Sequence, residues 1–266
     1  MTEKDWLASL PPPLLQVEDL SFYYGDQVGC LDINFQLYPG EVLGIVGESG
    51  SGKSTLLNCL SGHQPPSSGR VMFDHRQQGL VDLFALSEPE RRLLMRTDWG
   101  LVRQNPRDGL RMNVSAGGNV GERLMAVGAR HYGHIRGQAE QWLGRVEIAS
   151  DRLDHLPTTF SGGMQQRLQI ARNLVSQPRL IFMDEPTGGL DVSVQAKLLD
   201  LLRGLVRDLN IAAIVVTHDL AVVRLLADRL LVMRQGRVVE SGLTDQVLDD
   251  PQHPYTQLLV SSVLQV

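Results

Sequence analysis

The stretch Gly47-Glu48-Ser49-Gly50-Ser51-Gly52-Lys53-Ser54 decides the fold of this chain. It matches the pattern G-x-x-x-x-G-K-[ST], it follows the apolar run VLGIV at 42–46, and we expect a helix to begin at Lys53. Glycines let the backbone wind tightly with its N–H groups pointing inward, and a helix N-terminus adds partial positive charge. The stretch therefore predicts a phosphate-binding loop between a buried strand and a helix.

The residues of this loop have distinct expected roles toward a nucleoside triphosphate. We expect Lys53 to reach the β- and γ-phosphates, Ser54 to bind Mg²⁺ through its hydroxyl, and Thr55 to assist at the helix start. A chance match in a chain of this length is on the order of one in a hundred, judged from average residue usage. The expected nucleotide contacts are Gly47, Ser49, Gly50, Ser51, Gly52, Lys53, Ser54 and Thr55.

Two acidic residues, Asp184 and Glu185, directly follow the apolar run LIFM at 180–183. Parallel sheets bind their ligands at the carboxyl ends of the strands, which is where these carboxylates are expected. We expect Asp184 to hold Mg²⁺ through water and Glu185 to orient and deprotonate the attacking water. The alternative role, a cap for the next helix, would fit an isolated Asp-Glu pair equally well, but the phosphate loop favours the catalytic role.

The remaining pattern predicts an α/β fold: a P-loop core with a β-rich sub-domain and a helical sub-domain. Apolar runs at 42–46, 180–183 and 211–216 indicate a buried parallel sheet. Short apolar pieces with turn signals predict strands at 14–40 and a hairpin at 231–240. We divide the chain into an extended leader at 1–13, a single domain at 14–262 with its helical sub-domain at about 85–175, and a tail at 263–266.

A second glycine-rich segment resembles a motif of the ATP-binding-cassette (ABC) family. Ser161-Gly162-Gly163-Met164-Gln165 is similar to the family signature LSGGQ, with Phe160 in place of Leu and Met164 in place of Gln. In that family the loop opens a helix and binds the γ-phosphate held by the other subunit, so the resemblance implies a dimer. A serine and two glycines at a helix start also suit a second anion site on physical grounds.

Four further residues carry this resemblance. Gln104 resembles the glutamine that senses Mg²⁺ and the attacking water, and His218 resembles the switch histidine that contacts the γ-phosphate. Asp191 resembles the family's D-loop aspartate, although Gly188-Gly189 stands where Ser-Ala is usual. Tyr24 resembles the aromatic residue that stacks on adenine, with Tyr23 as the alternative. The resemblance covers nearly the whole chain and implies an ATPase that uses ATP and Mg²⁺.

Composition limits the classes of partner. The chain has 266 residues, a net charge of −5 and 42% hydrophobic residues, so no global basic field attracts nucleic acid. We find no signal-peptide pattern and no apolar run of roughly 18 residues that would span a membrane. Cys30 and Cys59 have no metal-binding spacing and are typical of reduced thiols. We therefore expect a cytoplasmic protein with no direct membrane span.

The branch of the family depends on longer resemblances. Gly47-Glu48-Ser49 and the segment 253–259 resemble peptide and nickel importer ATPases, but Arg107–Asn113 departs from the importer stretch Ser-Leu-Asn-Pro. The segments 114–136, 155–175 and 183–206 closely resemble the ABC subunits of the bacterial carbon–phosphorus lyase system, which breaks down phosphonates. This resemblance implies a second copy of the chain and the lyase core subunits as partners, with a second ABC subunit as a further candidate.

Three functional hypotheses stay open at this point. The chain is an ATPase of the phosphonate-degrading complex, the ATPase of an importer for a small nutrient, or a binding module that closes on ATP and barely hydrolyses it. The presence of both Glu185 and His218 weighs against the third. Arg92 and Arg96, four apart in a predicted helix from Glu88 to Met95, share one face and precede Gln104. We hypothesise that they pair with carboxylates of the partner, against the alternative of a solvated basic face.

Overall fold

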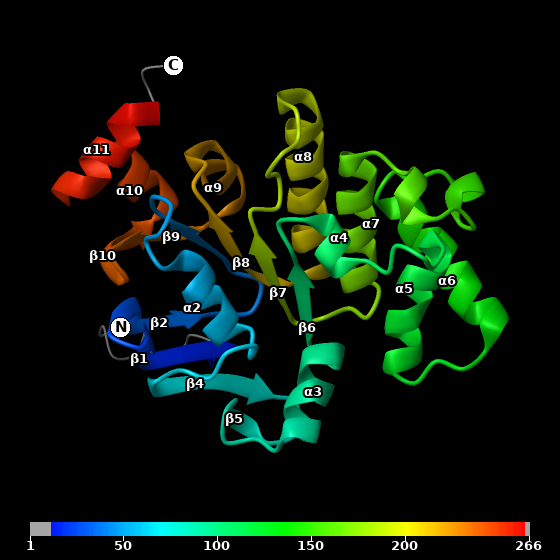
Figure 1. Ribbon diagram of the computed structural model, residues 1–266, viewed down its shortest axis with the longest axis horizontal. Helices are drawn as coiled ribbons and strands as arrows, with labels where there is room; N and C mark the ends of the chain where they lie inside the picture. The colour runs from blue at the N-terminus through cyan, green and yellow to red at the C-terminus, as the bar shows by residue number, and fades with distance from the viewer. Residues whose placement is uncertain (1–11, 264–266) are drawn as a thin grey trace, which may run out of the picture.

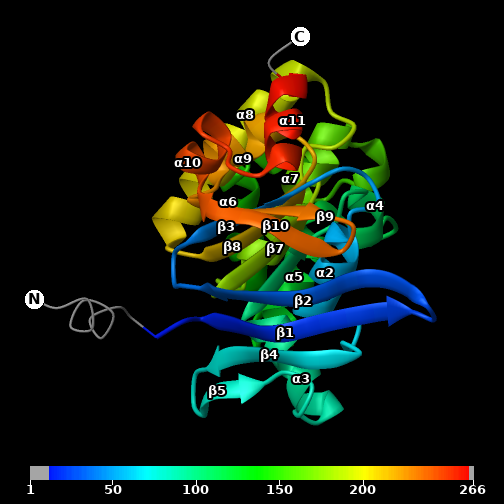
Figure 2. The same ribbon diagram turned by 90° about the vertical axis from the view of Figure 1, so that its left-hand side faces the viewer.

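The computed structural model describes residues 12–263 and contains two β-sheets with helices around them (Figure 1). Most of the predicted leader at 1–13 and tail at 263–266 lies outside the described residues. Figure 2 shows the two sheets stacked, with helix α2 (Lys53–Leu60) between them. The strands expected at 42–46, 180–183 and 211–216 and the hairpin turning at Gln235-Gly236 are all present.

The larger sheet has six strands in the order β10-β9-β3-β8-β7-β6. Five of them run parallel, and β10 pairs antiparallel with β9. Every residue of β3 and β8 is buried, which explains the continuous apolar runs in the sequence. The strands are β3 (Val42–Val46), β6 (Trp99–Val102), β7 (Leu180–Asp184), β8 (Ala212–Thr217), β9 (Arg229–Arg234) and β10 (Arg237–Leu243).

The two faces of this sheet enter different cores because side chains of a strand alternate. Ala213 and Val215 of β8 pack into the core that contains Leu198 and Leu202 of helix α8 (Val192–Leu209). Ile214 of β8 packs on the opposite face into the core of α2 and the smaller sheet. Helix α9 (Leu220–Leu226) contacts β3 and β8.

The smaller sheet is antiparallel, with the order β2-β1-β4-β5. Trp99 of β6 joins the two sheets: its ring lies edge to face with Phe73 of β4 at 5.2 Å and with Phe182 of β7 at 5.3 Å between centroids. Trp99 is 2% exposed, so this aromatic cluster belongs to the core. The strands are β1 (Leu15–Tyr24), β2 (Gln27–Leu37), β4 (Ser68–His75) and β5 (Gly79–Asp82).

Helices dominate the stretch predicted as the helical sub-domain, but β6 lies within it. This strand is four residues long and contains a glycine, so its pattern was too short to show in the sequence, and we did not predict it. Short 3₁₀ turns occur at Ser150–Arg152 and Pro157–Thr159. The helices are α3 (Glu88–Thr97), α4 (Pro106–Gly109), α5 (Ala116–Ala126), α6 (Tyr132–Arg145) and α7 (Gly162–Leu174).

Helices α10 (Thr244–Asp249) and α11 (Pro254–Val263) lie beside the β9–β10 hairpin (Figures 1 and 2). The Glu240 carboxylate of β10 accepts hydrogen bonds from the backbone N–H groups of Gln252 and His253, at 2.8 and 3.0 Å. Tyr255 is 4% exposed and packs into a core with Val46 and Val232. This anchor places α11 next to the loop that follows β3.

Candidate functional site

The predicted phosphate loop lies between β3 and α2, as expected. Gly50 and Gly52 have φ angles of 80° and 100°, in the left-handed region that favours glycine. Gly52 also has no room for a side chain, because a Cβ there would collide with the backbone oxygen of Gly29. These constraints explain the glycine spacing of the motif: each position shapes the loop that precedes α2.

Lys53 is 7% exposed, and its ammonium group lies inside the loop. Its Nζ donates to the backbone oxygens of Gly47 and Glu48, both at 2.7 Å. Burial lowers the pKa of Lys53, while the charges of Glu185 and Asp184 act in the opposite direction. The lysine is therefore held at the loop by two backbone carbonyl groups.

Glu185 stands at the end of β7 and receives three hydrogen bonds. Its Oε2 accepts from the Thr217 hydroxyl at 2.8 Å, and its Oε1 lies 3.0 Å from the backbone nitrogen of His218 and 2.7 Å from that residue's Nδ1. Glu185 itself has a left-handed φ of 45°. The Glu185 side chain is 14% exposed and that of His218 is 70% exposed, so the carboxylate is held from the strand side while the histidine faces solvent.

One cleft of about 710 Å³ brings most of the predicted site together. The phosphate loop forms one wall, and the ends of β6, β7 and β8 contribute Gln104, Asp184, Glu185 and His218. Burial and the neighbouring Glu185 raise the pKa of Asp184. The residues that line the cleft are Tyr24, Gln27, Val28, Gly29, Gly47, Glu48, Ser49, Gly50, Gly52, Lys53, Ser54, Thr55, Gln104, Asp184, Glu185, His218 and Leu259.

Of the two candidate tyrosines, Tyr24 lines this cleft and Tyr23 does not. Tyr24 is 51% exposed, and its ring rests edge-on against Phe22, with 4.9 Å between centroids. Its hydroxyl lies 3.2 Å from Oγ1 of Thr55 at the start of α2. An exposed ring anchored in this way can stack on a flat base, so the geometry favours Tyr24 over Tyr23.

Sequence reasoning missed two polar groups that support the site. Thr217 precedes His218 and bonds Glu185, and its place at the end of a predicted strand was the signal that could have revealed it. The hydroxyl of Tyr255 in α11 accepts a hydrogen bond from the backbone N–H of Glu48 at 3.0 Å. No local signal in the sequence connects these two residues, which are 207 positions apart.

The second glycine-rich segment does not enter the cleft. Ser161 begins α7 as its cap, and its hydroxyl accepts from the backbone N–H of Met164 at 3.3 Å. Gly162 lines a different cavity of about 320 Å³, together with Gly188 and Gly189. Asp191 is exposed at the start of α8 and lines neither cavity. Ser161, Gly162, Gly163 and Asp191 therefore lie apart from the phosphate loop within one chain.

Arg92 and Arg96 lie on α3 and line a third cavity of about 320 Å³. Arg92 forms an ion pair with Glu88 one turn earlier on the same helix. Three further arginines, Arg103, Arg123 and Arg172, line this cavity, in which the only carboxylate among the lining residues is Asp108. Burial and the charge of Arg172 lower the pKa of Arg123 to about 10. Arg172 pairs with Glu122 at 2.8 Å, so two of the five arginines that line the cavity have an acidic partner.

The phosphate loop, the strand-end carboxylates and the two-sheet architecture agree with comparisons to known proteins. A family model described as "ABC transporter" matches residues 30–188. This chain belongs to the ABC transporter family. The ABC cassette is 68% identical over 253 residues to the putative phosphonates utilization ATP-binding protein PhnK of Escherichia coli (strain K12), covering 95% of this chain and 98% of that protein.

Other relatives of the cassette include importers and dimeric structures. It is 36% identical to the dipeptide transport ATP-binding protein DppF of E. coli (strain K12), covering 96% of this chain and 78% of that protein. Among solved structures, it resembles the dimeric ATP-binding cassette MJ0796 in a post-hydrolysis state bound to ADP and Pi. That match has a TM-score of 0.77 and 29% identity, and it covers 86% of this chain and 98% of the other.

The family and these neighbours establish the activity: the cassette is an ATPase that converts ATP and water to ADP and phosphate. They also confirm the predicted fold, a P-loop α/β cassette. Between residues 12 and 263, none of the helices is long and apolar enough to cross a membrane.

Proposed function

We propose that two copies of this cassette close around ATP in the cytoplasm and dock on the carbon–phosphorus lyase core complex in phosphonate catabolism. The observation that carries this proposal is the 68% identity to the E. coli phosphonates utilization protein over nearly the full length of both chains. The identity to the dipeptide transport protein DppF is 36%. The difference favours the phosphonate system over the importer, which remains the second candidate because the segment 253–259 resembles importer ATPases.

Hydrolysis in this proposal is carried by the residues at the strand ends. Glu185 orients the attacking water and accepts its proton, while Thr217 and the His218 backbone hold the carboxylate in place. The His218 ring contacts the γ-phosphate. Lys53, whose ammonium group lies inside the phosphate loop, donates to phosphate oxygens, and Tyr24 stacks on adenine.

The oxygen donors of the cleft fit Mg²⁺. Ser54, Gln104 and Asp184 offer a hydroxyl, an amide oxygen and a carboxylate from three different elements, and hard divalent cations prefer such ligands. The burial that raises the pKa of Asp184 is offset when a cation neutralises the carboxylate. Held by these residues, Mg²⁺ would supply positive charge that offsets the negative charge of the phosphates during hydrolysis.

A second copy of the chain supplies the missing half of each nucleotide site in this proposal. Ser161, Gly162 and Gly163 lie at the N-terminus of α7 and do not line the cleft of the phosphate loop of their own chain, so in this proposal they contact a nucleotide held by another copy. Asp191 is exposed nearby and is proposed to lie at the same interface. The dimeric neighbours of the cassette support this arrangement.

Arg92 and Arg96 are proposed to bind carboxylates of the partner, because they open onto a cavity with three more arginines. The test is charge reversal, Arg92→Glu with Arg96→Glu, followed by co-purification. Arg91→Glu on the same helix is the matched control, since Arg91 lies over the ring of Phe84 and does not line the cavity. Complex formation that survives the double reversal would contradict the docking role.

The Glu185→Gln variant tests the function as a whole. Tagged protein is purified with ATP and Mg²⁺ from phosphate-starved cells, and the co-purifying proteins are identified. We expect lyase core subunits with two copies of the cassette, and turnover reduced by about 10²- to 10⁴-fold because a general base is lost. An integral membrane permease in the eluate would support the importer instead, and unchanged turnover would remove Glu185 as the base.

A further inference from the structure

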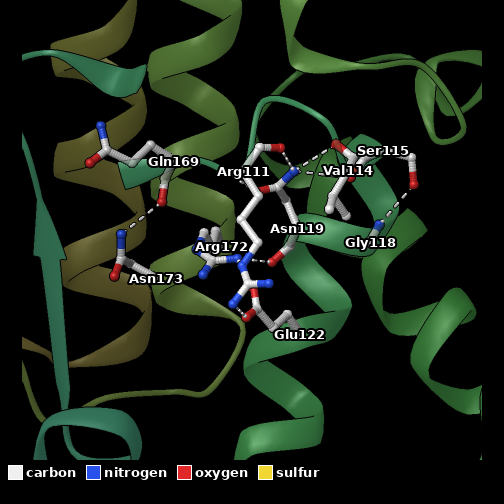
Figure 3. A network of polar contacts seen from close by, with 9 residues as sticks. All are labelled: Arg111, Val114, Ser115, Gly118, Asn119, Glu122, Gln169, Arg172 and Asn173. Carbon is white, nitrogen blue, oxygen red and sulfur yellow. Dashed lines mark hydrogen bonds and ion pairs between the residues drawn. The ribbon is translucent and has the colours of Figure 1, made fainter. Parts of the chain in front are cut away.

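Side-chain amides of helix α7 bond the backbone at the outer edge of the larger sheet. Strand β6 is the last strand of that sheet, so its outer backbone groups have no neighbouring strand. Asn173 accepts from the Leu101 N–H and donates to the Leu101 oxygen, both at 3.0 Å. Gln169 does the same for Arg103, at 2.6 and 3.1 Å. The two side-chain amides thus bond the backbone groups that a further strand would otherwise bond. Figure 3 shows both side chains on one side of α7.

The amide contacts continue from β6 to the end of β7. Nε2 of Gln169 also donates to Oε1 of Gln166 at 3.1 Å, and Nε2 of Gln166 donates to the Pro186 oxygen at 2.9 Å. Gln169 is 0% exposed and Gln166 is 2% exposed, so water does not compete for these groups. A continuous bridge therefore joins the backbone of Arg103 to the backbone of Pro186.

The ends of this bridge are adjacent to the two strand-end residues proposed to act in hydrolysis. Arg103 directly precedes Gln104, and Pro186 directly follows Glu185. The same helix begins at the loop Ser161-Gly162-Gly163. Buried amides are costly to leave unpaired, so Gln166 and Gln169 hold these backbone segments at fixed positions relative to each other.

The fit around Gln169 is close. Gly109 of α4 lies so near that a Cβ at this position would collide with the Gln169 amide oxygen, and the next nearest atoms are also in the Gln169 side chain. The side chain is flexible, so a methyl group at 109 would displace the amide rather than the backbone. This gives a way to disturb the bridge without changing either glutamine.

We propose that Gln166 and Gln169 are positioning residues for ATP hydrolysis, which hold Gln104 and Glu185 in fixed relation to each other and to the Ser161-Gly162-Gly163 loop. The inference rests on the proposed roles of Gln104 and Glu185. The new element is that two buried side chains of α7 connect the ends of β6 and β7 with the loop Ser161-Gly162-Gly163. Edge capping alone would give these residues a role in stability but none in turnover.

The test compares the isosteric variants Gln166→Met and Gln169→Met and their combination. Turnover number, affinity for a fluorescent ATP analogue and free energy of unfolding are measured for each. We expect kcat to fall roughly 10- to 100-fold, as small misplacements of reacting groups do, with nucleotide affinity changed less than about threefold. The double variant should lose no more than the worse single variant, because both glutamines belong to one bridge.

Asn119→Leu is the matched control. Asn119 is 0% exposed in α5, and its amide bonds Arg111, Val114 and Ser115, none of which belongs to the bridge (Figure 3). This variant should lose stability and keep kcat within about twofold in the folded protein. Gly109→Ala displaces the Gln169 amide without changing either glutamine, so it should lower kcat as Gln169→Met does. It therefore tests the bridge even if a glutamine variant folds poorly.

Several results would overturn the proposal: full kcat in Gln169→Met, additive losses in the double variant, or an equal kcat loss in Asn119→Leu. The Glu185→Gln variant, assayed in parallel, separates this failure from a failure of the proposed function. If Glu185→Gln abolishes turnover while the glutamine variants do not affect it, only the bridge is wrong. If Glu185→Gln keeps turnover, the roles on which the bridge depends are wrong.

Discussion

Replacing Thr217 by Val removes one hydroxyl from beneath the proposed catalytic base and leaves the shape of the side chain nearly unchanged. Thr217 is 0% exposed, and its hydroxyl donates to Oε2 of Glu185 at 2.8 Å. Within residues 12–263, the other carboxylate oxygen, Oε1, is bonded by His218, and Oε2 is bonded by Thr217. The variant removes one of the three hydrogen bonds to the Glu185 carboxylate, together with the acceptor of the Asp219 N–H.

A hydrogen bond to a charged group contributes about 1.5 to 3 kcal/mol. At about 1.4 kcal/mol per factor of ten, complete loss of this positioning lowers kcat by about 10- to 150-fold. The nucleotide affinity should stay the same, because Thr217 does not line the cleft. Steady-state ATPase kinetics and titration with a fluorescent nucleotide measure the two quantities separately.

Thr217→Ser is the control, since it keeps the hydroxyl and removes only the methyl group. We expect it to retain kcat within about threefold while it loses about 1 kcal/mol of stability from the buried methyl. If Thr217→Val and Thr217→Ser show the same kcat, the hydroxyl does not position Glu185. The hydrogen bond would then serve folding alone, and the reasoning above would be refuted.

Three further predictions concern the phosphate loop and the core. Tyr255→Phe removes the acceptor for the Glu48 N–H and should lower the free energy of unfolding by about 1 kcal/mol in denaturant titrations, whereas Tyr38→Phe, whose hydroxyl is exposed, should not. Lys53→Met should weaken ATP binding at least about tenfold in a fluorescent-nucleotide titration; unchanged affinity would contradict phosphate contact. Trp99→Ala should cost about 3 to 5 kcal/mol of unfolding free energy, and a loss below about 1 kcal/mol would show that the two sheets do not depend on this ring.

Much of the fold could be predicted because its core strands carry their own signals. The runs at 42–46 and 180–183 are continuously apolar, and buried parallel strands have that pattern. The phosphate loop and the strand-end pair Asp184-Glu185 then follow from spacing, and the structure places them in one cleft. Strand β6 was missed because four residues are too few for a period to show.

The contacts between distant segments could not be predicted in the same way. Gln166 and Gln169 look like ordinary polar residues of a helix in the sequence, and only the packing of α7 against β6 buries them. The bond from Tyr255 to the phosphate loop likewise depends on where the β9–β10 hairpin places α11. Local periodicity carries no information on such pairings, because they are set by the tertiary arrangement.

The hydrogen bond between Glu48 and Tyr255 also sets an order of events during synthesis. The ribosome makes the phosphate loop early, and the partner of its Glu48 N–H emerges 207 residues later. At ordinary rates of translation this delay amounts to about 10 to 40 s. During that interval the nascent loop lacks a contact that the finished protein has, so a chaperone or a nucleotide that binds the loop in this period meets a less constrained form of it.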